Sequence, residues 1–430
     1  MPATTPNVGV RTFVNRADVQ PVLIADNSTI GGVFTAPNAD NTLFPLDTPV
    51  HFTTDDAAMV AAAGDASGTL RQALDRIAAE GISTSLVVVR VNKTATIDTQ
   101  MAAMVGSAAS KTGAYALLSA SAETGATPNL LIGPEFTSQR LGNAANPLTT
   151  AFDGICEALG TAMAFCSTPS SSKEAAVEWA ADFASTMNII AIAQQARVFD
   201  SGSAGVISAG IITRDVTPAL AALQVRTDKE RGGPYYNPGN QALRGITGPS
   251  RAVSCNISDP SSEANWLLQR GVNSLVQLER NRTSRSTNAP QGKTFWGFFN
   301  TCSDPLWRAI NVVRTRKAVR EVIPRTLVKY IGQNLGAHLT TLLVQSLDDF
   351  LRELKHLPEP AILGGEVIWD RNLNSNASLR LGGLSIKMDF EEAPPLTGID
   401  VYTGRMETAF NILASDIQSA MNQSRVSGTF

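Results

Sequence analysis

Short apolar strands alternate with helical segments through the middle of the chain. Four runs that are apolar on both faces predict buried strands, at residues 86–91, 130–133, 162–166 and 189–193. Helical segments separate them, as at 173–184, and a further helix is expected at 70–80, capped by Ser67 and ended by Gly81. Buried strands that alternate with helices are typical of a mostly parallel sheet covered by helices. Residues 21–250 are therefore predicted to form an α/β body.

A charged tract rich in Gly, Pro and Asn at residues 226–250 predicts a domain boundary. Beyond it we expect helices at 262–269 and 339–356, a basic helix between them, and strands at 274–278, 295–299, 367–370 and 384–390. Helices and strands that follow each other without the regular alternation of the first region predict an α+β unit. This second domain is expected to cover residues 251–395.

Both ends of the chain carry a short alternating strand without a tight hairpin turn to a neighbour. The positions that define these two strands are Val8, Val10, Arg11 and Phe13 at one end and Ile399, Val401 and Tyr402 at the other. The second strand follows a break at Pro394-Pro395. A lone terminal strand leaves backbone N–H and C=O groups for another sheet edge to pair with. Residues 1–20 and 396–430 are therefore predicted to be arms.

Charged residues make up only 17% of the chain, against about 25% in an ordinary soluble domain. Two interpretations remain open, a surface that is largely buried against partners and an ordinary soluble protein of low charge. The net charge of −3 disfavours a protein that coats nucleic acid, because phosphate binding requires a basic field. No signal peptide is expected at the N-terminus, and no run reaches the ~20 apolar residues of a membrane span.

Catalytic and cofactor motifs are incomplete. Gly292-Lys293-Thr294 ends like a phosphate-binding loop, but Thr287 stands where that loop needs glycine. Ser203 lacks the first glycine of a nucleophile elbow. The three histidines and the neighbouring acid pairs have no spacing typical of a metal or acid–base site. We therefore expect neither a catalytic site nor a metal or other cofactor.

Four cysteines are too few and too scattered to predict a disulfide framework: Cys156, Cys166, Cys255 and Cys302. Buried free thiols are the first interpretation. Cross-links between subunits after release into an oxidising medium are the alternative.

The basic helix carries the candidate binding surface. At ~100° per residue its four cations cover an arc of roughly 160°, and they are Arg314, Arg316, Lys317 and Arg320. Glu321 is the only acid near them in the sequence, so pairing within the helix cannot neutralise them all. Two interpretations remain open, an ordinary solvated face and a surface for an acidic partner.

Several motifs downstream of residue 250 carry a family resemblance. They are the turn Ser250-Arg251-Ala252-Val253, the loop Asn281-Arg282-Thr283, the Trp296 strand before the basic helix, and the run from Trp369 to Asn374. In this order they resemble the C-terminal region of contractile tail sheath proteins of bacteriophages and related injection machines. The resemblance implies a non-enzymatic structural subunit that polymerises helically around an inner tail tube and contracts to drive the tube through the host envelope.

The resemblance also implies partners, a location and residue roles. Further copies, the inner tail tube protein, and the baseplate and tail terminator proteins would be the partners, with no direct contact to nucleic acid or membrane. The protein would be assembled in the host bacterial cytoplasm and reside in the virion tail. The four helix cations would hold the tube, and the two terminal strands would extend the C-terminal-domain sheet of neighbouring subunits.

Two other classes of function compete with this prediction. An α/β enzyme or ligand-binding protein would use the strand ends of residues 86–193, where Asn92, Glu135 and the pair Gln194-Gln195 could line a pocket. A nucleic-acid binder would use the basic helix, which the acidic chain as a whole disfavours. The sequence does not separate a phage from a bacteriocin or a secretion apparatus.

Overall fold

The computed structural model describes residues 28–200, 210–256, 259–278 and 292–426. Its largest sheet has nine strands in the order β2-β3-β1-β4-β5-β6-β11-β12-β9. The six strands from β3 to β11 in this order run parallel, and β2, β12 and β9 pair antiparallel at its two sides. The expectation of a mostly parallel sheet is confirmed.

The strands of this sheet are short and mostly buried. Their bounds are β1 Ile30–Thr35, β2 Pro49–Thr53, β3 Ser85–Val91, β4 Leu130–Ile132, β5 Met163–Ser167, β6 Ile189–Ile192, β9 Gln241–Ala242, β11 Val272–Leu278 and β12 Gly292–Trp296. The four strands expected between residues 86 and 193 are all present, within one residue of the expected limits at each end.

Helices cover both faces of the sheet. One face packs against α2 Thr69–Ala79 and α7 Thr217–Arg231, and the other against α3 Ile97–Val105, α5 Pro147–Leu159, α6 Lys173–Ala181 and α8 Glu263–Leu268. Short helices complete the layers, namely α1 Ala57–Ala62, η1 Gly113–Leu118, α4 Ala120–Thr124 and η2 Leu141–Asn143. Two hydrophobic cores, one on each face, hold this three-layer body together.

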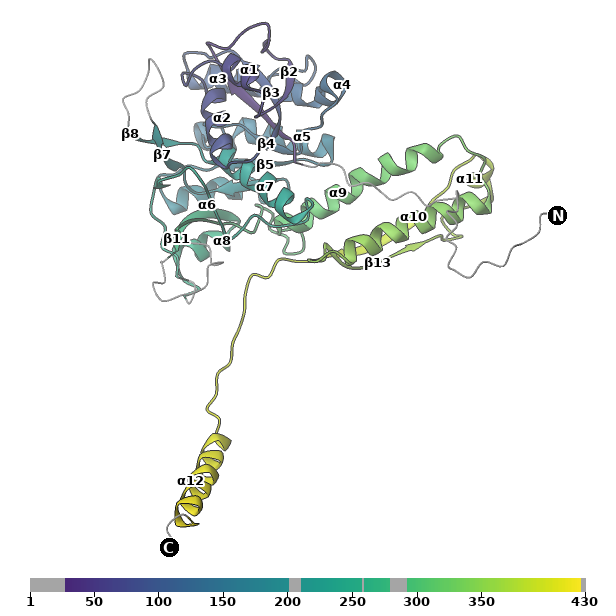
Figure 1. Cartoon of the computed structure of the whole chain (residues 1–430). Helices are drawn as coiled ribbons and strands as arrows, with labels where there is room; N and C mark the ends of the chain where they lie inside the picture. Colours follow the sequence, from purple (N-terminus) through teal and green to yellow (C-terminus); the bar gives the residue numbers. More distant parts are fainter. Residues whose placement is uncertain (1–27, 201–209, 257–258, 279–291, 427–430) are drawn as a thin grey trace, which may run out of the picture. The chain divides into compact units, whose positions relative to one another are not determined.

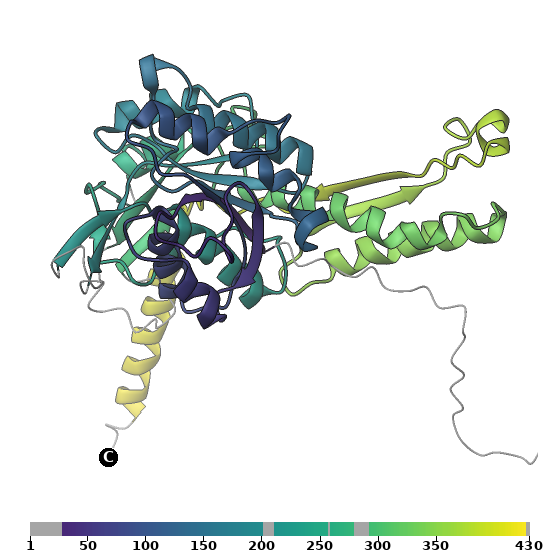
Figure 2. The ribbon, with the colours of Figure 1, turned by 90° about the horizontal axis from the view of Figure 1, so that it is seen from above.

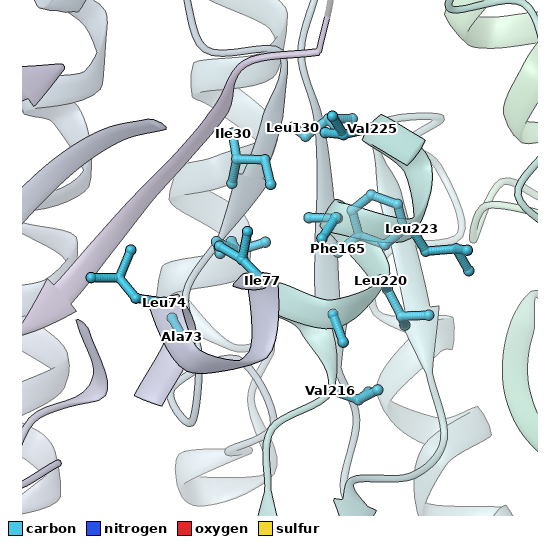
Figure 3. Close-up of a cluster of buried hydrophobic side chains, with 14 of the residues drawn as sticks. Ile30, Ala73, Leu74, Ile77, Leu130, Phe165, Val216, Leu220, Leu223 and Val225 are labelled. Carbon is cyan, nitrogen blue, oxygen red and sulfur yellow. The ribbon is translucent and has the colours of Figure 1, made fainter. Parts of the chain in front are cut away.

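Alternation along the strands divides the side chains between these two cores. In β3, Leu86 and Val88 belong to the core under α2 and α7, whereas Val87 and Val89 belong to the opposite core. Figure 3 shows the first core, where Ile77 of α2 lies with Phe165 of β5 and side chains of α7. Strands that are apolar on both faces need this double cover, because either face left open would expose them to water.

The tract at 226–250 is not a linker. Its first six residues complete α7, whose residues from Thr217 to Asp228 are all buried, and Gly232 ends the helix with a φ of 82°. After the tract, Val272 of β11 pairs with Ala191 of β6. The sheet therefore continues across residue 250, where the sequence suggested a division into two domains.

A smaller sheet lies beside the body, in the order β10-β7-β8. Its strands are β7 Ala196–Asp200, β8 Gly210–Arg214 and β10 Gly248–Pro249. All three pair antiparallel, and the sequence analysis identified none of them.

An extension of two helices and a two-stranded sheet leaves the body after β12 (Figures 1 and 2). It is made of α9 Ile310–Leu327, η3 Val328–Tyr330, α10 Ala337–Lys355, β13 Ile362–Ile368, α11 Asn376–Arg380 and β14 Lys387–Glu392. Strand β13 begins five residues earlier than the expected 367–370, and β14 begins three residues later than the expected 384–390. A third core joins this extension to Tyr235 and Tyr236 of the body.

The contact pattern divides the chain into two compact units, residues 1–395 and 396–430. The second unit contains one helix, α12 Thr408–Val426, which the sequence analysis did not predict. Residues 398–402, expected as a strand, have no regular secondary structure here and are exposed. The expected N-terminal strand at Val8, Val10, Arg11 and Phe13 lies outside the described residues, as does the Asn281-Arg282-Thr283 loop.

Candidate assembly interface

Arg314 of the basic helix is buried, with a side chain only 5% exposed. Its Nη1 and Nη2 atoms donate to Oδ1 and Oδ2 of Asp228 on α7, each at 2.7 Å. Asp228 also accepts from Gln224 Nε2 at 2.8 Å and from Ser28 Oγ at 3.2 Å. A two-pronged pair of this kind fixes both side chains in one geometry. Arg314 therefore joins α9 to α7 inside the protein.

Lys317 is also buried and points into the body. Its Nζ donates to the Ala162 carbonyl oxygen and to Asn188 Oδ1. Asn188 in turn donates through Nδ2 to Asp153 Oδ1 and Glu157 Oε1, each at 2.7 Å. Burial lowers the pKa of Lys317 because the charged amine loses water that these neighbours only partly replace. This lysine ties α9 to the residues that precede β5 and β6.

Arg316 and Arg320 lie closer to solvent. Arg316 forms an ion pair with Glu392 at the end of β14, and its guanidinium stands 4.2 Å from the centre of the Phe390 ring. These contacts hold β14 against α9, although 40% of the Arg316 side chain remains exposed. Arg320 is exposed and lies over Gly160, the residue that ends α5.

The expectation of one exposed cationic face is therefore wrong. Arg314 and Lys317 are buried and form hydrogen bonds inside the protein, and the partly exposed Arg316 forms an ion pair with Glu392. Glu321, the only acid near the four cations in the sequence, forms an ion pair with Arg325. Asp228 and Glu392, which neutralise two of the cations, are far away in the sequence. Binding to a tube stays a prediction. Of the four cations, Arg320 is the one classed as exposed.

The two-stranded sheet of β13 and β14 offers open edges. Its register runs from Ile362 opposite Glu392 to Ile368 opposite Lys387. One face packs on the helices through Met388 and Phe390, while neither outer edge pairs with another strand of the described chain. A two-stranded sheet is marginal by itself, and unpaired edges favour the addition of further strands.

Residues 399–402 match what such an edge accepts. Ile399, Val401 and Tyr402 are 74%, 76% and 94% exposed, and Asp400 keeps the alternation of apolar and polar positions. Exposed apolar side chains at this density are unusual for a segment that remains in water. The segment is therefore a candidate donor strand, although in the single chain it has no strand geometry.

Three of the residues expected to line a ligand pocket at the strand ends take part in internal hydrogen bonds, Asn92 and Glu135 through the backbone and Gln194 through its side chain. The Asn92 carbonyl oxygen accepts from Gln100 Nε2 at 3.0 Å, and the Glu135 N–H donates to Asp215 Oδ2 at 2.8 Å. The Gln194 side chain accepts from the N–H of Leu275 and donates to its carbonyl oxygen. The Gln194 side chain therefore fastens β11 to the strand end after β6.

The cysteines form no disulfide with one another. All four cysteines are free thiols, and burial raises the pKa of Cys156 to about 12, which keeps it unreactive at neutral pH. Within the described ranges, no group of three or more His, Cys, Asp or Glu side chains could hold a metal ion. None of the helices in the described ranges is long and apolar enough to cross a bilayer.

Sequence reasoning missed two apolar surfaces. The first is a pair of hollows beside α10, which share Leu335 and Leu384 among their lining residues. The second is one side of α12, where Phe410 and Ile417 are 75% and 54% exposed. The spacing of the α12 residues is visible in the sequence and could have predicted the helix. The hollows depend on elements far apart in the chain and could not be predicted that way.

Curated relatives of the chain are tail proteins. It is 28% identical over 313 residues to a putative prophage major tail sheath protein of Pseudomonas aeruginosa, covering 72% of this chain and 74% of that protein. It is 25% identical over 423 residues to the tail sheath protein of Escherichia phage P2, covering 94% and 98%. The major tail sheath protein of Serratia phage KSP20 is 26% identical over 409 residues. No protein-family model matches the chain.

Solved sheath structures share the fold. The sheath of an extracellular contractile injection system, PVC, in the contracted state has a TM-score of 0.65 at 13% identity, covering 95% of this chain and 99% of that one. The contracted helical sheath of the anti-feeding prophage has a TM-score of 0.64 at 15% identity, covering 94% and 100%. Relatives and fold agree with the motifs around residues 250–296, and the chain belongs to the contractile tail sheath family as a structural subunit of such a sheath.

Proposed function

We propose that the chain assembles with its own copies into a helical sheath by strand addition. Residues 399–402 of one copy, and the N-terminal strand around Val8, Val10, Arg11 and Phe13 of another, add to the open edges of β13 and β14. Two features carry this proposal: within the described residues the outer edges of β13 and β14 pair with no further strand, and the same chain has an exposed alternating segment at 399–402. Mutual exchange of such strands produces a polymer.

The sheath encloses an inner tail tube and contracts by movement of folded bodies into a wider, shorter lattice. Such a rigid-body transition is driven by conformational free energy stored at assembly and needs no nucleotide, and the chain acts without enzymatic activity. Baseplate and tail terminator proteins bind the two ends of the polymer. Assembly takes place in the host bacterial cytoplasm. The sheath relatives and the contracted-state fold matches support this proposal.

Electron microscopy of the purified chain tests the strand addition. The variant carries proline at two successive positions, Asp400→Pro and Val401→Pro. Successive N–H groups of a strand point to opposite edges, so this pair removes a donor whichever edge is paired. Hollow cylinders should form with the unchanged chain and with the control Leu396→Pro, which lies before the segment. Cylinders that persist in the double variant would refute strand addition by residues 399–402.

A tube contact by α9 is tested with Arg320→Glu and Arg314→Glu. Arg320 is exposed, so its reversal should weaken co-assembly with the tube protein while the fold remains intact. Arg314→Glu would bury two carboxylates together and should disrupt the fold itself. Circular dichroism and sedimentation separate the two effects. Normal co-assembly of a folded Arg320→Glu chain would remove this residue from the tube contact.

A further inference from the structure

The α12 helix is amphipathic. At about 100° per residue, Phe410, Leu413, Ile417 and Ala420 fall within an arc of roughly 80°. The opposite side is uncharged and polar, formed by Asn411, Ser415, Gln418 and Asn422. Phe410, Leu413 and Ile417 are each more than half exposed. A narrow seam with steps of three and four residues is typical of a helix that packs along another helix.

The two hollows beside α10 form an apolar groove in the extension. The larger has a volume of about 580 Å³ and is lined by Leu335, Thr340, Val344, Trp369, Leu379 and Leu384, with other residues of α10. The smaller, of about 440 Å³, continues from Leu335 and Leu384 toward α9 and β14. Leu335 and Trp369 are each 39% exposed and Leu381 nearby is 89% exposed. Large apolar side chains gathered on one surface mark a binding site for another apolar surface.

The groove has the shape that a helix requires. Along α10 it is lined by Ala337, Thr341 and Val344, whose steps of four and three residues repeat those of α12. These side chains are small, so another helix backbone can approach closely. Both α10 and α12 have 19 residues, about 28 Å at 1.5 Å per residue. A single helix can therefore fill the groove along the exposed half of α10.

The linker to α12 connects this groove with the proposed strand addition, on which the inference rests. Only five residues separate Tyr402 from Thr408, where α12 begins, and an extended chain spans at most about 3.6 Å per residue. The start of α12 must then lie within roughly 22 Å of an added strand. If residues 399–402 pair with β14 or β13 of a second copy, α12 is delivered to that copy, whose Met388 and Ile386 on the β14 side line the smaller hollow.

We propose that α12 docks into the α10 groove of the second copy that accepts residues 399–402. Its apolar seam covers the groove, and its polar side stays toward water. The arm thus holds its neighbour through two different contacts, backbone hydrogen bonds at the sheet edge and apolar packing along α10. The second contact does not depend on the hydrogen-bonding geometry of the first.

Disulfide trapping between copies tests the docking. One copy carries Ile417→Cys in the seam, and a second copy with a size tag carries Thr341→Cys in the groove, an exposed position. Both carry Cys255→Ser, because the other three natural cysteines are buried. Each copy has one engineered thiol, so a mixed-size product joins two copies by construction. Gln418→Cys, on the polar side of α12, replaces Ile417→Cys in the matched control.

Oxidation of the assembled mixture should give a strong mixed-size band with Ile417→Cys and a much weaker one with Gln418→Cys. Equal bands, or none in cylinders that have formed, would overturn the docking and leave strand addition standing. A chain carrying both Ile417→Cys and Thr341→Cys that closes only on itself would show that the groove takes its own α12, which also overturns the proposal. The variant with Asp400→Pro and Val401→Pro is also combined with the two engineered cysteines. If it still forms cylinders and the cross-link still forms in them, the docking is supported and strand addition is refuted.

Discussion

Removing one partner of the buried pair of Asp228 and Arg314 should destabilise the first unit by several kcal/mol. Both side chains are 5% exposed or less, so solvent screens their attraction far less than it does for a surface pair. Asp228→Asn keeps the shape of the side chain but removes the negative charge that both Nη atoms of the buried Arg314 guanidinium bind. Breaking such a pair from one side costs about 3–5 kcal/mol. For a unit of 395 residues this lowers Tm by about 4–6 °C if the unit unfolds as a whole.

The control is Asp348→Asn, which breaks the exposed pair of Asp348 and Arg352 on α10 and should cost less than about 1 kcal/mol. Differential scanning calorimetry of the unassembled full chain gives both shifts, and hydrogen exchange of α7 and α9 locates the loss. Asp228→Asn combined with Arg314→Met should recover much of the loss, since no charge is then left unpaired. If Asp228→Asn lowers Tm no more than Asp348→Asn does, the pair does not anchor α9 and the reasoning fails.

Two further substitutions follow from local geometry. Gly154 lies in α5 with open space around the position of a Cβ, so Gly154→Ala should raise the free energy of unfolding by about 0.5–1 kcal/mol, and an unchanged denaturation midpoint would contradict this. Burial, and then the charge of Asp215, raise the pKa of Glu135, so the folded chain binds this proton more tightly than the unfolded chain does. Glu135→Gln should therefore stabilise the protein at pH 7–8, by an amount that shrinks as pH falls through the folded pKa and vanishes below the unfolded value of about 4.3. A stability gain of equal size at pH 3.5 would refute the assignment.

Strands with both faces apolar were predictable, whereas strands defined by close backbone approach were not. The four expected strands between residues 86 and 193 contain long apolar runs, but β1 between β3 and β4 contains Gly31 and Gly32. Glycine pairs usually weaken a strand. Here they are required, because a Cβ at Gly31 would stand 2.4 Å from Pro128 Cβ. The sequence contains the glycines, but the neighbour that requires them is almost one hundred positions away.

The candidate site was predicted only in part, again because some of the deciding contacts join residues far apart in the sequence. The family and the exposed segment at Ile399 and Val401 follow from local motifs and alternation. The roles of Arg314 and Arg316 do not, because their acidic partners Asp228 and Glu392 lie 86 and 76 positions away. A cation with no acid within one helical turn looks solvated in the sequence, and only the tertiary contact shows that it is buried. The charged tract after residue 226 is a similar case, since Arg226 and Asp228 are buried in α7 and the sheet continues beyond residue 250.

These internal cations also determine where the chain can bend. Arg314 and Lys317 fix the first half of α9 in the body, and the Tyr236 hydroxyl donates to the Glu359 carbonyl oxygen near the start of β13. Body and extension therefore move together, because separating them would expose buried charges. Beyond Pro395 the compact unit ends. A force applied to added strands in a contracting sheath would thus turn each body and its extension as one piece, with the change of direction taken up in the linker that begins at Leu396.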